Sequence, residues 1–100
     1  MFFDNDQILD HILTMPSGYE RNKAVYLYNR VNDDALAYRG GAAMLDFEVM
    51  TFAIDDGKND VRRLLLLLDG ENLYDYDHDH IEQLFSTWVW DHVMGDDTEL

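Results

Sequence analysis

The stretch VRRLLLLLDGEN, residues 61–72, decides between two folds for this chain. Five consecutive leucines followed by the turn pair Asp69-Gly70 are typical of a fully buried central strand. The same stretch also suits a helix, because leucine favours helical backbone and Asp60 is placed to cap one. We predict a strand here, and the alternative is an all-α fold.

The segments before the leucine run favour the strand interpretation. Apolar and polar side chains alternate in KAVYLYNRV, residues 23–31, and again in MLDFEVMTFAI, residues 44–54. Residues 35–39 are short enough to be a further strand, and Asp56-Gly57 stands in a connector of hairpin length. The polar positions 46, 48 and 51 do not gather on one helical face. These patterns predict an antiparallel sheet of about four strands.

We expect a helix at each end of this sheet, which makes the fold class α+β. Residues 5–15 carry an apolar stripe, and Asp4 and Gln7 are spaced as a capping box. Residues 79–94 carry a second stripe, which Trp90 does not share. The expected domain is a single acidic globular unit, residues 1–95, with a frayed acidic tail over residues 96–100.

The motif YDYDHDH, residues 74–80, stands at the entry to the second helix. Asp79 as the N-cap and Glu82 three residues later match a capping box. Asp77 is a rival N-cap, and Tyr76 with Ile81 would then form the hydrophobic staple. Acidic residues at this end also suit the helix dipole.

The motif also raises the possibility of a metal site. Its three aspartates match the first ligands of a calcium-binding EF-hand loop, but His80 and Ser86 stand where that loop requires glycine and glutamate. A transition-metal site that uses His78 and His80 is the alternative, although histidines two residues apart do not share a helical face. We predict no cofactor and no metal.

Composition limits the functional classes. The chain has 100 residues, 47% of them hydrophobic, and its 21 acids and 7 bases give a net charge of −14. It has no cysteine and no apolar run long enough to span a membrane, and its N-terminus lacks the features of a secretory signal. We therefore expect a cytoplasmic protein that avoids nucleic acid and membranes and binds basic protein surfaces, unless the charge serves solvation alone.

In size and charge the chain resembles the small acidic inhibitors of phages and mobile elements, which include DNA-mimic anti-restriction and anti-CRISPR proteins. The resemblance implies a non-enzymatic inhibitor that occludes a basic, nucleic-acid-binding site on a partner. One alternative is an immunity protein or antitoxin that neutralises a cationic nuclease toxin. Another is a small metal-binding protein that uses His78 and His80. No catalytic motif competes with these readings.

The expected partner-binding residues form two acidic groups and one apolar anchor on the last helix and around it. Charge speeds association, whereas a tight complex also needs a desolvated centre. The first acidic group surrounds the helix entry, the second lies near the helix end, and the anchor lies between them. In that order the residues are Asp75, Asp77, Asp79 and Glu82, then Asp91, Asp96 and Asp97, and finally Trp90 with Met94.

Overall fold

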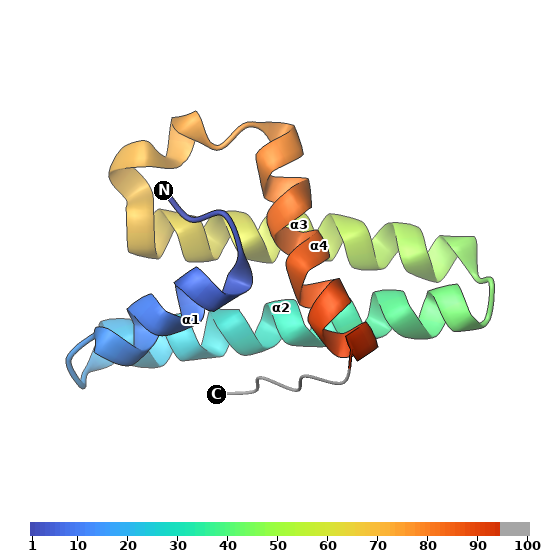
Figure 1. Cartoon of the computed structure of the whole chain (residues 1–100), viewed down its shortest axis with the longest axis horizontal. Helices are drawn as coiled ribbons and strands as arrows, with labels where there is room; N and C mark the ends of the chain where they lie inside the picture. The colour runs from blue at the N-terminus through green and yellow to red at the C-terminus, as the bar shows by residue number, and fades with distance from the viewer. Residues whose placement is uncertain (95–100) are drawn as a thin grey trace.

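The computed structural model describes residues 1–94, and these residues form helices without any strand. The predicted α+β fold is therefore wrong, and the all-α alternative is correct (Figure 1). In chain order the elements are α1 (Asn5–Thr14), α2 (Tyr19–Ala43), α3 (Phe47–Asp69), the 3₁₀ helix η1 (Gly70–Asp75) and α4 (His78–Met94).

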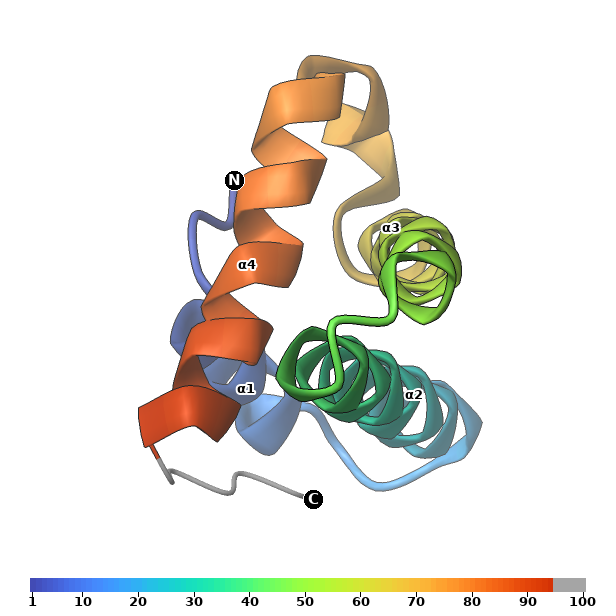
Figure 2. The same cartoon turned by 90° about the vertical axis from the view of Figure 1, so that its right-hand side faces the viewer.

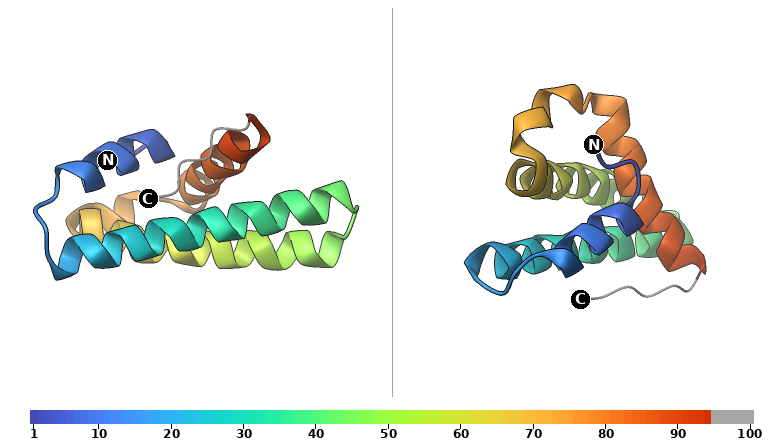
Figure 3. Two further views of the ribbon diagram at one scale, coloured as in Figure 1. Left: turned by 90° about the horizontal axis from the view of Figure 1, so that it is seen from below. Right: turned by 60° about the vertical axis from the view of Figure 1, so that its left-hand side comes forward.

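The helices form two layers. The long helices α2 and α3 run antiparallel as a hairpin, and α1 and α4 lie against one side of that hairpin (Figure 2). The view from below shows α2 and α3 side by side along their length (Figure 3). Within residues 1–94, no helix combines the length and the apolar character needed to cross a membrane.

The leucine run belongs to the second half of α3. Leu64 and Leu65 are fully buried, whereas Leu66 is 61% exposed, as expected when successive side chains turn by about 100° around a helix. A central strand would have required cover for all five leucines on two faces. The helix begins far upstream, where Asp46 accepts a hydrogen bond from the Val49 backbone N–H at 3.2 Å.

The alternation in residues 23–31 conceals the buried face of α2. The fully or almost fully buried residues recur with helical spacing and include two alanines and one tyrosine that the two-residue pattern leaves out. The apolar and aromatic ones are Ala24, Leu27, Tyr28, Val31 and Ala35, and Asn32 is buried as well. Only some of the alternating apolar residues thus belong to the core. The predicted strands over residues 23–31 and 35–39 are wrong.

The predicted hairpin turn at Asp56-Gly57 lies in the middle of α3. Gly57 is there for packing: a Cβ atom built on it would lie 2.3 Å from Cε1 of Phe85 in α4. The glycine therefore lets α4 approach α3 closely, and its conformational freedom is not used. The strand predicted over residues 44–54 is replaced by the α2–α3 turn and the first two turns of α3.

The turn between α2 and α3 is short and closed by backbone hydrogen bonds. The Asp46 N–H donates to the Gly41 carbonyl at 2.8 Å, and the Leu45 N–H donates to the Ala42 carbonyl at 3.2 Å, which is the Schellman arrangement. Leu45 occupies the left-handed position with a φ of 54°, where glycine is usual. Its side chain is 74% exposed.

Both predicted terminal helices are confirmed. α1 begins where expected, with the Asp4 carboxylate accepting a hydrogen bond from the Gln7 N–H at 2.9 Å. The Gln7 side chain accepts in turn from the Phe3 N–H at 2.7 Å, one residue before the position that a capping box uses. α4 spans the predicted range and begins one residue earlier.

Candidate partner-binding site

The net charge of the protein is concentrated in part of the fold. Residues 21–63, which make up most of the α2–α3 hairpin, contain seven acids and all seven lysines and arginines. The rest of the chain contains fourteen acids and neither lysine nor arginine. Eleven of these fourteen acids lie within residues 1–94, mainly in α1, η1, α4 and their connections. Residues 21–63 are therefore neutral, and the whole hairpin adds only the acids Glu20 and Asp69 to them. The other layer, which we call the acidic layer, carries most of the charge of the described residues.

One role of the YDYDHDH motif is to begin α4. Asp77 is the residue that caps the helix, because its carboxylate accepts a hydrogen bond from the His80 N–H at 2.7 Å. The rival cap is thus the correct one, and the predicted Asp79 cap is wrong. The reason is that Tyr76 and Ile81 are both buried in the core, which sets the N-cap between them as a hydrophobic staple requires.

A second role of the motif is to hold the N-terminal segment in place, through Tyr76 and His80. The Phe2 N–H donates to the Tyr76 hydroxyl at 2.8 Å, and that hydroxyl donates to Asp69 at 2.6 Å. Burial, followed by the hydrogen bond to Asp69, raises the pKa of Tyr76 to about 12. His80 Nε2 lies 2.7 Å from the Phe2 carbonyl oxygen and donates to it, and the His80 ring stacks on Phe3. These contacts hold the start of α1 beside α4.

His78 and His80 do not face a common point. His78 Nε2 lies 3.3 Å from Lys58 Nζ and 3.7 Å from a Glu82 carboxylate oxygen, whereas His80 contacts the N-terminal segment. Among the described residues there is no group of three or more histidine, aspartate or glutamate side chains that could hold a metal ion. The geometry of residues 1–94 therefore gives no support to the metal-binding alternative.

The predicted partner-binding residues fall into separate places on α4. Asp75, Asp77, Asp79 and Glu82 are exposed around its first turn. Asp91 lies twelve residues beyond Asp79, or about 18 Å along the helix axis. Met94 is the last residue of α4, and Asp96 and Asp97 lie outside the described residues. The acids at the two ends therefore form two distinct groups.

The structure adds two acids that sequence reasoning missed. Asp4 and Asp6 at the start of α1 line the same pocket as Asp91, and Asn5 donates a hydrogen bond from Nδ2 to Asp91. No local sequence pattern predicts that Asp4 and Asp6 lie near Asp91, because these residues are far apart in the sequence. The absence of lysine and arginine from both ends of the chain was, however, visible in the sequence.

Trp90 stands between two pockets. It is 63% exposed, which its position off the apolar stripe of α4 permitted but did not decide. On one side lies an apolar groove of about 220 Å³, with Glu82 and Ser86 at its polar edge and its walls formed by Tyr38, Ile54, Phe85, Val89, Trp90 and Val93. On the other side lies an acidic pocket of about 400 Å³, lined by Asp4, Asn5, Asp6, Gln83, Ser86, Thr87, Trp90 and Asp91. Neither hollow is lined by a lysine or an arginine.

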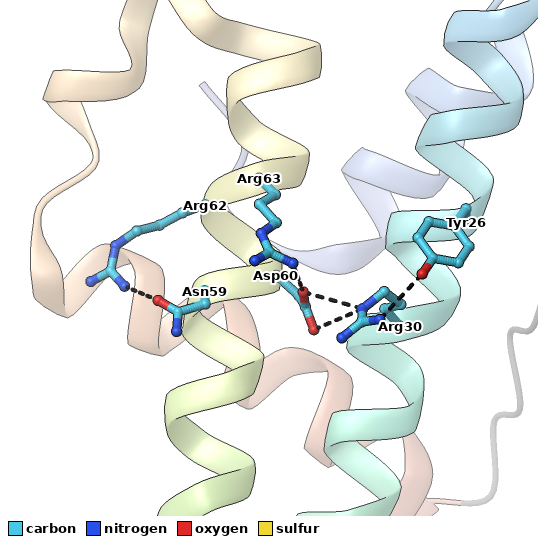
Figure 4. Close-up of polar contacts among 6 residues, drawn as sticks. All are labelled: Tyr26, Arg30, Asn59, Asp60, Arg62 and Arg63. Atoms are coloured by element: carbon cyan, nitrogen blue, oxygen red, sulfur yellow. Dashed lines mark hydrogen bonds and ion pairs between the residues drawn. The ribbon is translucent and has the colours of Figure 1, made fainter.

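A second cluster of charged groups lies in the nearly neutral hairpin. Asp60 of α3 is 2% exposed and lies 3.4 Å from Arg30 Nε and 3.3 Å from Arg63 Nη1 (Figure 4). The pKa of the neighbouring Asp34 is raised to about 8, first by burial and then by its hydrogen bond with Asp60 and the charges of Asp60 and Asp56. The raised pKa favours the protonated form of Asp34 beside the Asp60 carboxylate at neutral pH. Neither residue lines the groove or the acidic pocket, so the pair belongs to the α2–α3 interface.

No family model matches this chain, and no curated protein or solved structure matches it. Its function is therefore inferred from its own residues and their geometry.

Proposed function

We propose that this protein is a non-enzymatic inhibitor that binds a basic, nucleic-acid-binding site on a partner protein and occludes it. The partner would be a cytoplasmic enzyme of the restriction or CRISPR type, and the inhibitor would act as a mimic of nucleic acid. The observation that carries the proposal is the concentration of the net charge of −14 outside residues 21–63, mainly in the acidic layer and the chain ends, beside a nearly neutral α2–α3 hairpin. If the acids served solvation alone, we would expect the net negative charge to be spread over both layers.

The amount of charge suits this role. Duplex DNA carries one negative charge per about 1.7 Å, so fourteen charges correspond to roughly 24 Å of duplex. The longest dimension of the protein is 41 Å. Over that length the fourteen charges give roughly 60% of the linear charge density of duplex DNA, and they would draw a basic surface toward the protein by long-range attraction.

Charge alone would give a fast but weak complex. Exposed ion pairs contribute little net affinity, and salt screens them. The exposed Trp90, between an apolar groove and an acidic pocket, offers the desolvated centre that a tight inhibitor needs. The sequence holds no catalytic motif that would favour an enzymatic function instead.

The proposal is tested by capture of a partner from a lysate of the source cells, followed by competition with nucleic acid. The captured partner should bind nucleic acid, and added inhibitor should displace that nucleic acid. Raising the salt concentration should weaken the complex steeply. A partner that holds inhibitor and nucleic acid together, or a complex indifferent to salt between low and physiological ionic strength, would refute the proposal.

Two variants of equal charge sharpen the test. Asp75→Asn with Asp77→Asn removes two charges from the acidic layer and keeps the cap, because asparagine caps helices as well as aspartate does. Asp33→Asn with Glu48→Gln removes two exposed charges from the nearly neutral hairpin. The first variant should slow association and flatten its salt dependence, whereas the second should leave both close to wild type. Equal effects from the two variants would show that only the total charge matters.

A further inference from the structure

The apolar groove is too small for a separate ligand and suits a single side chain. Its volume of about 220 Å³ lies below the range of roughly 300–1,000 Å³ that is usual for small-molecule sites. Phe85 is buried and Val89 is half-buried, whereas Trp90 and Val93 are more than half exposed at its edge. One large apolar side chain that entered the groove would cover these exposed edges.

The acidic pocket beside the groove favours a positive charge. Three carboxylates, those of Asp4, Asp6 and Asp91, line it together with the indole of Trp90. Carboxylates form charge-assisted hydrogen bonds with a guanidinium group, and an aromatic ring adds cation–π attraction. Arginine satisfies both kinds of contact better than lysine does, because its planar group also stacks on aromatic rings.

The groove and the pocket are adjacent, because Ser86 and Trp90 line both of them. A bound chain that placed an apolar side chain in the groove would therefore carry its neighbouring residues past the acidic pocket. Two or three residues of extended backbone, which span about 7–10 Å, are enough to cross one side chain. The two hollows thus form a composite site for a short segment.

We infer that this composite site binds a protein segment in which one large apolar residue, such as phenylalanine or leucine, is flanked by arginines. This inference rests on the proposed function and specifies the chemistry of its partner. Nucleic acid is excluded as the occupant by the carboxylates of the pocket. A second copy of this chain is disfavoured, because its acidic layer would meet the same carboxylates.

Trp90 supplies a built-in reporter for the experiment. The other tryptophan, Trp88, is fully buried, so an emission change on peptide binding comes mainly from Trp90. The probe is a synthetic peptide with two arginines on each side of one phenylalanine. A control peptide has glycine in place of the phenylalanine and therefore the same charge. The phenylalanine peptide should shift the emission to shorter wavelength and bind about tenfold tighter or more, as burial of one phenylalanine predicts.

Variants locate the binding site on the protein. Val93→Ser and Trp90→Ser each alter the groove, and peptides with a fluorescent label follow binding where the tryptophan is lost. Each substitution should abolish the advantage of the phenylalanine peptide. Val93→Ser should leave the glycine peptide unchanged, whereas Trp90→Ser should also weaken it somewhat, because the indole lines the acidic pocket as well. Asp4→Asn with Asp6→Asn retains the α1 cap and should weaken both peptides. Asp33→Asn with Glu48→Gln, in the hairpin, should weaken them less.

The outcomes separate this inference from the function on which it rests. Equal binding of the two peptides, with no effect of Trp90→Ser or Val93→Ser, would overturn the composite site and leave the electrostatic function standing. Failure of both peptides to bind at low salt would overturn the two together. A shift of Trp90 emission with protein concentration alone, accompanied by dimers in sedimentation, would overturn the inference and assign the groove to a second copy.

Discussion

Replacing Gly57 with alanine tests how closely α3 and α4 pack. The added Cβ atom would lie 2.3 Å from Cε1 of Phe85 and 2.6 Å from both Cδ1 and Cζ, whereas ordinary contacts lie between 3.4 and 4 Å. The Phe85 ring is only 3% exposed, so it cannot move aside without displacing its neighbours in the core. We therefore expect the substitution to destabilise the protein.

The expected magnitude follows from two opposing effects. Overpacking of a core costs about 1–3 kcal/mol, and three ring atoms in close contact place this substitution at the upper end. Alanine recovers about 1 kcal/mol because it favours helix more than glycine does. The net loss in the free energy of unfolding is then about 2 kcal/mol. For a chain of this length, that loss lowers the Tm by about 8–16 °C.

Urea denaturation followed by circular dichroism measures this loss, and a second glycine provides the control. Gly40 also lies in a helix, but a Cβ atom built there would meet no heavy atom within 4 Å. Gly40→Ala should therefore stabilise the protein by about 0.5–1 kcal/mol. The two glycine-to-alanine substitutions should thus change the free energy of unfolding in opposite directions.

A double-mutant cycle identifies the Phe85 ring as the cause. In a Phe85→Ala background the Cβ atom meets no ring, so Gly57→Ala should become neutral or stabilising. Phe85→Val serves the same purpose if Phe85→Ala does not fold. If Gly57→Ala costs as much without the ring as with it, the backbone of Gly57 is responsible and our packing explanation is wrong.

Further substitutions test three other local features. Leu45→Gly should stabilise the protein by about 1 kcal/mol, because it relieves a left-handed backbone at an exposed residue; a loss of stability in urea would contradict this explanation. Asp77→Ala should cost about 1 kcal/mol through the lost α4 cap, whereas Asp79→Ala should cost less, and the reverse order would restore the cap predicted from sequence. The stabilisation that depends on the Asp34 proton is complete below the unfolded pKa of 3.8 and is lost as the pH rises to about 8, because folding raises this pKa. Asp34→Asn cannot ionise and should gain stability relative to wild type between pH 5 and pH 8, and equal pH dependence of the two proteins in thermal melts would refute the role of Asp34.

The ends of the chain were predictable because their signals are local. The N-cap of α1, the extents of α1 and α4, and the position of Trp90 off the apolar stripe all depend on residues within a few positions of one another. Whether another element covered Trp90 was decided only by the tertiary structure. The α4 cap was open between two aspartates, and packing chose Asp77 because Tyr76 entered the core. The sequence alone thus left the position of the α4 N-cap open between two residues, Asp77 and Asp79.

The middle of the chain was not predictable from the same signals. Alternation in residues 23–31 suggested a strand, although alanines and Tyr28 continue a helical face there. Gly57 suggested a turn, although it permits the approach of Phe85 from α4. In a sequence, a glycine in a turn cannot be told from a glycine at a helix crossing unless the side chain that packs against it is known.

The sequence by itself determined the terminal helices, the net charge and the absence of lysine and arginine outside residues 21–63. Only the tertiary structure decided that residues 23–43 and 47–69 are helical, because backbone propensities of less than about 1 kcal/mol per residue yield to burial worth about 1.5–3 kcal/mol for each large apolar side chain. Only the tertiary structure also joined Asp4 and Asp6 to Asp91 beside Trp90, since such meetings depend on how α1 and α4 pack on the hairpin.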